Sequence, residues 1–337
     1  MKAILVENIG EVVVKDIPDI TEVPEYGCLC KNIFASTCTG TDRKLIHNST
    51  PWENNYPGVL GHENVAEVIE VGAKVKNFAV GDIVMRPVYV YAGEERNGYS
   101  ALFGGFSEYG IVTDVKAMEA DGRSDFNPYA RYQAKIPKSW RNNPSAVMLI
   151  TLKETFSWLK KLPSLYGKDV AIIGSGTVGL FYTKLAAVFC AKSVTVLDIN
   201  SDRFDQAKKV GADNCINLLE SAKPEAAFDL LIDAAGILTK IADFIPMVRQ
   251  DGIFGIYGID GSLSAHFEGF GSGLTFAFHN SNEADPLVHE TCVGLVERGL
   301  VDLSDFHSSI MPFSQAPEAY ELLKARKEFK IVFELGK

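Results

Sequence analysis

Two short segments in the first third of the chain gather the residue types that bind zinc and move protons. The first runs from Cys38 to Asp42 and includes Thr41, and the second contains His62 and Glu63. Thiolate and imidazole groups are zinc ligands, and a catalytic zinc keeps one position open for a substrate oxygen. Such an ion would stabilise the alkoxide of an alcohol substrate, whose proton the Thr41 hydroxyl could relay. On spacing alone, His62 could equally be a hydrogen-bonded histidine in a turn, and Cys38 a small buried hydrophobe.

A glycine-rich turn in the middle of the chain has the spacing of a dinucleotide-binding loop. It follows the apolar run 170–173, opens an apolar helix and reads Gly174-Ser175-Gly176-Thr177-Val178-Gly179. Gly174 permits a tight turn, Gly176 lets the backbone approach a pyrophosphate, and Gly179 allows the helix to pack closely on the strand. The helix N-terminus, which carries Thr177 and Val178, would face the anion. The alternative is a glycine-containing turn that binds nothing.

The next apolar run, 194–197, ends at an acidic residue that bears on the choice of cofactor. Asp198 stands where a carboxylate accepts hydrogen bonds from the ribose hydroxyls of NAD. The same charge would repel the 2'-phosphate of NADP, although Arg203 lies close enough in sequence to meet such a phosphate. We therefore expect NAD as the cofactor.

The elements that position these residues change character along the chain. Up to about residue 137, short β-branched runs broken by Gly and Pro predict antiparallel β structure with long loops. Helical spacing begins at about residue 142, and from residue 169 strands alternate with helices, which predicts a parallel, doubly wound sheet. The fold class is therefore α/β. We expect one domain to comprise residues 1–151 and 286–337 and the dinucleotide-binding domain to comprise 152–285, with the polar stretch 118–132 as a surface loop or an insertion.

Composition excludes several classes of protein. The chain has 337 residues, a formal net charge of -10 and no basic cluster, which argues against a nucleic-acid partner. No apolar run approaches the roughly 20 residues of a membrane span, and the N-terminus lacks the pattern of a signal peptide. The six cysteines are scattered, as expected for reduced thiols rather than a disulfide framework. We therefore expect a cytoplasmic protein with a small-molecule substrate and no membrane partner.

Several longer stretches together resemble the medium-chain dehydrogenase/reductase superfamily, in particular its alcohol, polyol and glucose dehydrogenase branches. The most specific resemblance runs from Pro57-Gly58-Val59-Leu60-Gly61-His62-Glu63 through residues 68–72 to Val80-Gly81-Asp82. Residues 104–109 and 228–236 resemble further parts of the same superfamily, so the resemblance extends nearly from end to end. It implies a GroES-like β domain joined to a Rossmann domain, with substrate and nicotinamide meeting in the cleft between them. By analogy with relatives we expect a homodimer or homotetramer.

The resemblance also implies roles for the residues of the first segments. His62 would be a catalytic zinc ligand, Glu63 an alternative ligand or a neighbour acting through water, Thr41 the proton relay and Asp42 a group that orients the site. The superfamily cysteine usually stands immediately before Gly-Thr-Asp, whereas Cys38 lies one residue earlier. Because a shift of one residue reverses a side chain in a strand, Cys38 reaches a metal only if the backbone bulges.

The third zinc ligand departs from the superfamily pattern as well. Ile150 occupies the place that usually holds Cys or Glu, and Glu154 lies one helical turn further along the same face. Glu154 could reach the cleft or could be a solvated helix carboxylate. The four-cysteine lobe that binds structural zinc in many relatives is absent between residues 86 and 110, so we expect no structural zinc.

Two pictures of the metal site remain, and with them three functions. In the first, zinc is held by Cys38, by His62 and by either Glu63 or Glu154, together with water. In the second, the site has lost zinc and the chain has kept the fold. We favour zinc. The favoured function is NAD-dependent oxidation of a secondary alcohol in a sugar, polyol or cyclitol. The alternatives are a zinc-independent reductase and a non-catalytic dinucleotide-binding relative. The segment Asn280-Ser281-Asn282 resembles a stretch of sugar dehydrogenases beside the nicotinamide, or it is a loop that caps the domain.

Overall fold

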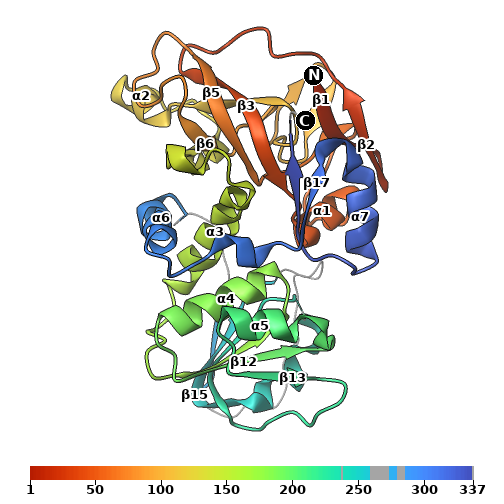
Figure 1. The fold of residues 1–337 in the computed structure, drawn as a ribbon, viewed down its shortest axis with the longest axis vertical. Coiled ribbons are helices and arrows are strands. Elements are labelled where there is room, and N and C mark those ends of the chain that lie inside the picture. The colour runs from red at the N-terminus through yellow and green to blue at the C-terminus, as the bar shows by residue number, and fades with distance from the viewer. Residues whose placement is uncertain (237, 259–272, 279–284, 336–337) are drawn as a thin grey trace. The chain divides into compact units, whose positions relative to one another are not determined.

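The structure is a computed structural model, and it describes residues 1–236, 238–258, 273–278 and 285–335. The chain divides into two compact units. The first comprises Met1–Ile150 and His307–Lys337, and the second comprises Thr151–Phe306. The red-to-yellow beginning and the dark blue end of the chain therefore share one unit in Figure 1, and the green and cyan middle forms the other.

The first unit is built on two β-sheets. One has the strand order β2-β1-β4-β8-β7, and the other follows β10-β6-β5-β3-β18-β17 with β9 paired to β3. Most neighbouring strands are antiparallel, as predicted, whereas β4 with β8 and β17 with β18 are parallel pairs. The strands are β1 (Lys2–Asn8), β2 (Glu11–Asp16), β3 (Gly27–Ser36), β4 (Gly58–Val59), β5 (Asn64–Val71), β6 (Ile83–Met85), β7 (Glu95–Arg96), β8 (Tyr99–Ala101), β9 (Tyr109–Thr113), β10 (Ala134–Ile136), β17 (Ser309–Pro312) and β18 (Ile331–Glu334).

Alternation of side chains along β3 and its neighbours explains why these runs form strands. Successive residues of a strand point to opposite faces of the sheet, so every second side chain can enter the core. Cys28 and Cys30 of β3 are fully buried and pack with Ala66 and Val68 of β5. The β3 strand thereby becomes the centre of its sheet, and its last residues are held where the candidate metal ligands begin.

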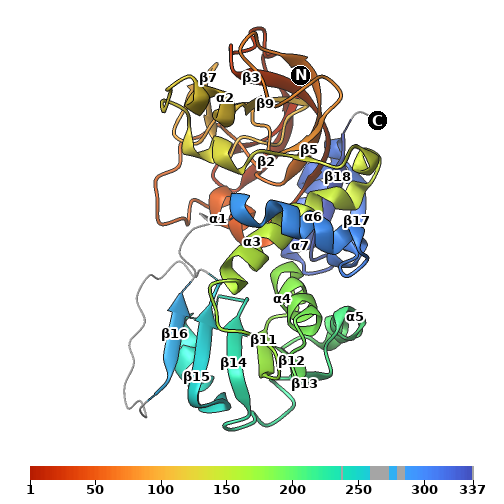
Figure 2. The same cartoon turned by 90° about the vertical axis from the view of Figure 1, so that its left-hand side faces the viewer.

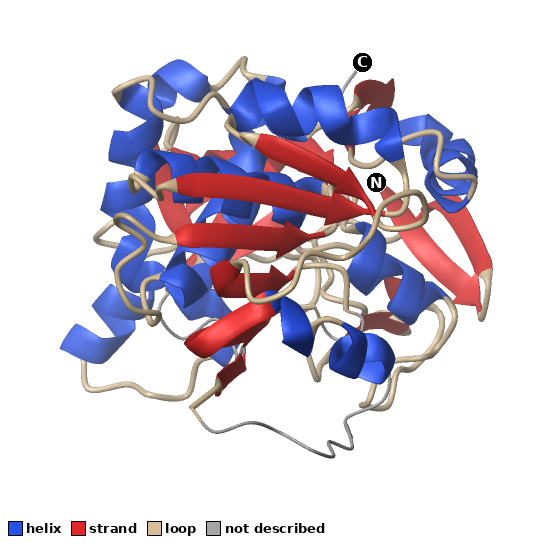
Figure 3. Cartoon of the chain, turned by 90° about the horizontal axis from the view of Figure 1, so that it is seen from below, coloured by secondary structure: helices blue, strands red, loops and turns tan. Residues whose placement is uncertain are grey.

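The second unit contains one parallel sheet of six strands in the order β13-β12-β11-β14-β15-β16. Figure 2 shows strands β11 to β16 side by side, and their red arrows run in a common direction in Figure 3. The strand β11 is fully buried, as expected for a parallel strand covered on both faces. The predicted parallel sheet is confirmed. Its strands are β11 (Asp169–Ile173), β12 (Ser193–Asp198), β13 (Asn214–Asn217), β14 (Phe228–Asp233), β15 (Val248–Ile256) and β16 (Thr275–Phe278).

Helices connect and cover these sheets. The α-helices are α1 (Thr39–Ile46), α2 (Val115–Ala120), α3 (Leu149–Leu159), α4 (Thr177–Val188), α5 (Phe204–Val210), α6 (His289–Glu297) and α7 (Ala316–Lys324). Short 3-10 helices include η1 (Pro128–Tyr132), η4 (Ser201–Arg203) and η8 (Leu303–Phe306). Among the described residues, none of these helices is both long and apolar enough to cross a lipid bilayer.

The return of the chain to the first unit differs from the expected position. We expected residues 286–337 to belong to the first domain, but the compact units place the change after Phe306. The ring of Phe306 stacks on that of Phe181 in α4 at 3.7 Å between centroids. Lys153 and Asp285 form a fully buried ion pair at 3.1 Å. These contacts hold the segment from 285 to 306 against the second unit.

The stretch 118–132 is only partly the surface loop that its polar composition predicts. It begins within α2 and ends in η1, where Tyr129 and Ala130 are buried. Local composition missed this burial because the partners of Tyr129 come from distant parts of the chain.

Candidate metal centre and dinucleotide loop

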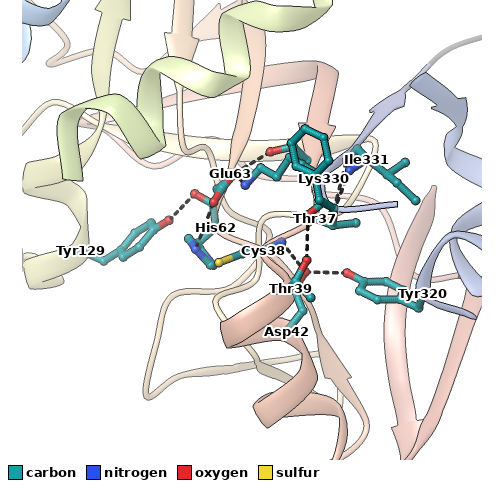
Figure 4. A network of polar contacts seen from close by, with 12 residues as sticks. Thr37, Cys38, Thr39, Asp42, His62, Glu63, Tyr129, Tyr320, Lys330 and Ile331 are labelled. Carbon is teal, nitrogen blue, oxygen red and sulfur yellow. Dashed lines mark hydrogen bonds and ion pairs between the residues drawn. The ribbon is translucent and has the colours of Figure 1, made fainter. Parts of the chain in front are cut away.

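The candidate metal ligands Cys38, His62 and Glu63 lie together in the first unit. One ligand atom from each residue lies within 4.8 Å of the other two. Figure 4 shows the three side chains converging from the start of α1 and from the segment that precedes β5. The sulfur, nitrogen and oxygen donors were predicted from the sequence as a group, and the structure brings all three into one cluster.

Cys38 reaches the cluster because the chain has left the strand before this residue. The strand β3 ends at Ser36, and Cys38 is the N-cap of α1 with φ -116° and ψ 92°. The rule that successive side chains alternate across a sheet therefore does not apply to it. The β3–β5 ladder also contains two register shifts, between Leu29 and Cys30 and between Asn32 and Phe34. Burial raises the pKa of the Cys38 thiol to about 12, so a cation would be needed to stabilise its thiolate.

His62 follows a glycine that no other residue could replace without rearrangement. Gly61 has φ +92°, and a Cβ there would lie 2.0 Å from the ring of Phe106. The His62 imidazole is buried, with its ring centroid 4.7 Å from that of Phe103. Its Nδ1 atom has no hydrogen-bond partner among the described residues. Its Nε2 atom lies 3.8 Å from Oε1 of Glu63.

Glu63 is held by two groups that sequence reasoning did not identify. The Ser36 hydroxyl donates to Glu63 Oε2 at 2.6 Å, and the Lys330 ammonium forms a buried ion pair with the same oxygen. Burial raises the pKa of Glu63, but the charge and hydrogen bond of Lys330 and the neighbouring His62 hold that pKa below its usual value overall. Oxygen Oε2 is thus occupied, and Oε1 is the atom that faces His62.

Asp42 and Thr41 support the cluster from the first turn of α1. Asp42 is fully buried, and its Oδ2 accepts hydrogen bonds from the Cys38 backbone N–H at 2.9 Å and from the Tyr320 hydroxyl at 2.8 Å. Burial raises the pKa of this carboxyl. The Thr41 side chain acts on Cys38 in the direction that lowers the pKa of the thiol, against the effect of burial.

The residues present fit a zinc ion. Zinc accepts sulfur, nitrogen and oxygen ligands at about 2.0–2.3 Å. The buried atoms His62 Nδ1 and Asp42 Oδ1, which have no hydrogen-bond partner in the described part of the chain, leave polar capacity beside the three donors. Glu154, the other candidate ligand, lies on α3 in the second unit. Ile150 is fully buried and offers no donor atom.

Lys330, Ser36 and Tyr320 are the residues of the site that the sequence did not reveal. Ser36 and Tyr320 stand in ordinary strand and helix patterns, and Lys330 lies 267 positions from Glu63. The Ile331 backbone N–H donates to the Thr37 hydroxyl at 3.0 Å, which places Lys330 beside the cluster. The only local signal was a lysine directly before a short apolar strand, and this signal does not specify a partner.

The glycine loop of the second unit contains glycines at positions where a side chain would be strained or would clash. Gly174 has φ +99°, and a Cβ on Gly179 would lie 1.9 Å from the Gly174 carbonyl oxygen. A Cβ on Gly176 would meet nothing within 4 Å, so this N-cap of α4 faces open space. The buried Thr177 hydroxyl has no hydrogen-bond partner among the described residues, and Val178 is half-buried beside it. The loop therefore offers unfilled space and an unused polar group at a helix N-terminus, as a bound pyrophosphate would need.

Asp198 ends β12 beside this loop. Its Oδ2 accepts hydrogen bonds from the backbone N–H and the hydroxyl of Ser175, both at 2.6 Å, and its Oδ1 accepts from the Asn200 backbone N–H at 3.0 Å. Arg203 is half-buried at the end of η4, where it caps α5. The segment 280–282, considered from the sequence as a neighbour of the nicotinamide, lies outside the described residues.

Comparison with known proteins finds similarity to dehydrogenases. Residues 31–121 match the alcohol dehydrogenase GroES-like domain family. The chain is 28% identical to an L-threonine 3-dehydrogenase of Pseudoalteromonas atlantica, over 71% of this chain and 73% of that protein. It is 26% identical to an uncharacterized zinc-type alcohol dehydrogenase-like protein, AdhB, of Bacillus subtilis, over 97% of this chain and 98% of that one.

A solved structure has the same fold. The alcohol dehydrogenase TADH of Thermus sp. ATN1 superimposes with a TM-score of 0.78 at 24% identity, covering 99% of each chain. At this level of identity the likeness concerns the arrangement of the backbone. It agrees with the β unit and the parallel-sheet unit described above.

Proposed function

From the premise that this chain belongs to the medium-chain dehydrogenase/reductase superfamily, we propose that it is an NAD-dependent dehydrogenase. Its substrate is a small polyhydroxylated molecule, a sugar, polyol or cyclitol, in which it oxidises a secondary alcohol. The observation that carries the proposal is the cluster of Cys38, His62 and Glu63, in which Cys38 is half-buried and the other two residues are buried. The polyhydroxylated class rests on the resemblance to the polyol and glucose dehydrogenase branches.

The side chains of the site have two roles in the proposed reaction, metal binding and proton transfer. A bound zinc ion would polarise the alcohol oxygen and lower its pKa. Cys38, His62 and Glu63 Oε1 are the groups that would hold it. Bound NAD would supply the hydride acceptor for the oxidation of the alcohol to a carbonyl. The Thr41 hydroxyl would take up the alcohol proton while passing its own hydroxyl proton to bulk water. Asp42 keeps Cys38 in place through the backbone hydrogen bond.

The preference for NAD rests on Asp198. A carboxylate at the end of β12 can accept hydrogen bonds from both ribose hydroxyls and repels a 2'-phosphate. The two hydrogen bonds from Ser175 fix its position against the glycine loop. Arg203 could meet a 2'-phosphate, but we give the repulsion by the Asp198 carboxylate the greater weight.

A second function, that of a zinc-independent reductase, is favoured by one observation. Lys330 already supplies a positive charge to Glu63 inside the protein, so this carboxylate is compensated without a metal ion. In that case His62 and Thr41 would act on a carbonyl or activated alkene without a Lewis acid. The metal content of the purified protein separates the two functions.

The test is turnover by the purified full-length protein, together with its metal content. Glucose, sorbitol, myo-inositol, L-threonine and ethanol would be offered with NAD and with NADP while reduction of the nicotinamide is followed. We expect turnover of at least one polyhydroxylated substrate with NAD and about one zinc ion per chain. Turnover of carbonyl compounds alone by metal-free protein would favour the reductase. Dinucleotide binding without any turnover would refute both functions.

A pair of histidine variants links the activity to the cluster. His62→Ala removes a proposed ligand and is expected to lower kcat/KM by at least 100-fold and to reduce zinc content. His47→Ala is the matched control, because His47 is exposed at the C-terminal end of α1. Equal activity of the two variants would contradict the assignment of the cluster.

A further inference from the structure

Residues 127–133 are fixed to neighbouring loop residues of the first unit by side chains at both ends. Asn127 donates from its side chain to the Ala92 carbonyl oxygen at 3.0 Å. Gln133 is buried, and its side-chain amide donates to the Arg86 carbonyl oxygen at 2.8 Å. These hydrogen bonds fix the position of the segment in the first unit, so its contacts with the metal cluster are fixed as well.

The segment places Tyr129 behind the candidate metal ligand. The Tyr129 hydroxyl donates to the His62 carbonyl oxygen at 3.4 Å, and Figure 4 shows the tyrosine reaching His62 from the side away from Tyr320. The guanidinium of Arg86, itself buried, lies over the rings of Tyr129 and Tyr132 at 5.8 and 5.6 Å from their centroids. Tyr129 is thereby held on one side by a cation and on the other by its hydrogen bond.

Phe103 completes this aromatic group and is the member that remains accessible. Its ring lies 4.7 Å from the His62 ring and 6.3 Å from the Tyr129 ring, measured between centroids. Unlike Tyr129, it is only half-buried. Its backbone has φ +73°, a conformation that is strained for a bulky side chain and that persists where the surroundings enforce it.

The neighbouring glycines explain what enforces this conformation. The Gly105 backbone N–H donates to the Gly61 carbonyl oxygen at 2.8 Å. A Cβ on Gly104 would lie 2.0 Å from the Val90 carbonyl oxygen, so the chain passes here without room for a side chain. Because Gly104 and Gly105 pass close to Val90 and Gly61, the backbone directs the Phe103 side chain toward His62.

We propose that Phe103, backed by Tyr129, is a specificity-determining residue that forms an apolar wall beside the metal cluster. The C–H face of a cyclic substrate, a sugar or cyclitol ring, lies against this wall while its secondary alcohol is directed at the cluster. An aromatic ring face is a suitable surface for such a substrate ring, because it covers the apolar C–H groups and has no polar atom that needs a hydrogen-bond partner. The inference rests on the proposed function and narrows it to substrates whose reacting carbon belongs to a ring.

The decisive comparison is the selectivity of Phe103→Ala between a cyclic and an acyclic polyol. For the cyclic polyol turned over best, we expect kcat/KM to fall about tenfold, equivalent to about 1.4 kcal/mol of lost contact. For an acyclic polyol of similar size we expect a change of less than threefold. The zinc content should remain that of the wild type.

Tyr129→Phe is the matched control, since it keeps the ring and removes only the hydrogen bond to His62. We expect it to preserve the ratio of kcat/KM between cyclic and acyclic substrates. Binding of the cyclic polyol in the presence of NADH, followed by calorimetry, gives a readout that needs no hydride transfer, and Phe103→Ala should weaken it about tenfold.

The outcomes separate this inference from the proposed function. If Phe103→Ala lowers kcat/KM equally for all substrates, or lowers zinc content, Phe103 merely orients His62 and the specificity role is wrong. Unchanged selectivity and unchanged binding overturn it as well. If the wild-type protein turns over no alcohol at all, the proposed function fails first, and the inference that depends on it fails with it.

Discussion

The buried ion pair between Lys330 and Glu63 offers the sharpest test of how this site is stabilised. The two side chains are 3% and 1% exposed, so neither charge is solvated by water. Replacing Lys330 by Met keeps a similar volume and removes the positive charge, while the Ser36 hydroxyl still donates to the Glu63 carboxylate. Breaking a buried pair in this way costs about 3–5 kcal/mol.

We therefore expect Lys330→Met to lower the free energy of unfolding of the metal-free protein by about 3 kcal/mol or more. The double variant Lys330→Met/Glu63→Gln should recover about 2 kcal/mol, because a neutral amide needs no counter-charge. Urea unfolding of the wild type, both single variants and the double variant measures the coupling energy directly. Additive effects, or a loss below 1 kcal/mol in Lys330→Met, would show that the pair is not the source of stability.

Unfolding in the presence of zinc tests whether Glu63 is a metal ligand. If the ion binds Glu63 Oε1, it supplies a positive charge that partly replaces the missing ammonium. The stability deficit of Lys330→Met should then be smaller in the presence of zinc than after treatment with a chelator. An identical deficit in both conditions would contradict a role for Glu63 as a ligand.

Three further predictions concern the second unit. Gly176→Ala should leave stability unchanged and weaken NADH binding at least tenfold. Gly179→Ala should lower both the stability and the affinity for NADH, because its Cβ would lie 1.9 Å from a carbonyl oxygen. Fluorescence titration of NADH and thermal unfolding distinguish the two variants. Asp198→Asn should raise the ratio of kcat/KM for NADP over NAD at least tenfold, and an unchanged ratio would exclude Asp198 as the selective group. Hydrogen bonds from Ser193 and ion pairs lower the pKa of Asp169 to about 2. Because the folded pKa lies below the unfolded one, Asp169 should contribute about 1–2 kcal/mol above pH 4 that is lost as the pH falls toward 2, and Asp169→Asn should flatten this part of the stability profile.

The spacing of residues was sufficient to predict the fold and the cluster of three donors. The glycine loop could be identified because its three glycines, the preceding strand and the following acid are local neighbours in the chain. Cys38 was the doubtful ligand, since strand alternation would have turned it away from the site. The structure resolves this point, because α1 begins at Thr39 and the alternation ends at Ser36.

Contacts between distant segments could not be predicted in the same way. The polar composition of residues 118–132 indicated a surface loop, yet Tyr129 lies buried behind His62. The expected return of the chain at residue 286 was 21 residues early, because aromatic stacking on Phe181 is invisible in the pattern around Phe306. In both cases the deciding partner is an aromatic residue or a backbone group far away in the sequence.

The sequence by itself determined the two classes of sheet, the glycine-rich turn between β11 and α4 and the chemical types of the candidate ligands, because periodicity and short spacings are local properties. The tertiary structure alone decided which charge faces Glu63 and which ring faces His62. Lys330 and Phe103 acquire their roles only when β18 pairs with β3 and when Gly105 meets Gly61. Burial then gives these contacts their strength, since a charge or a ring removed from water interacts chiefly with the few groups that the fold places beside it.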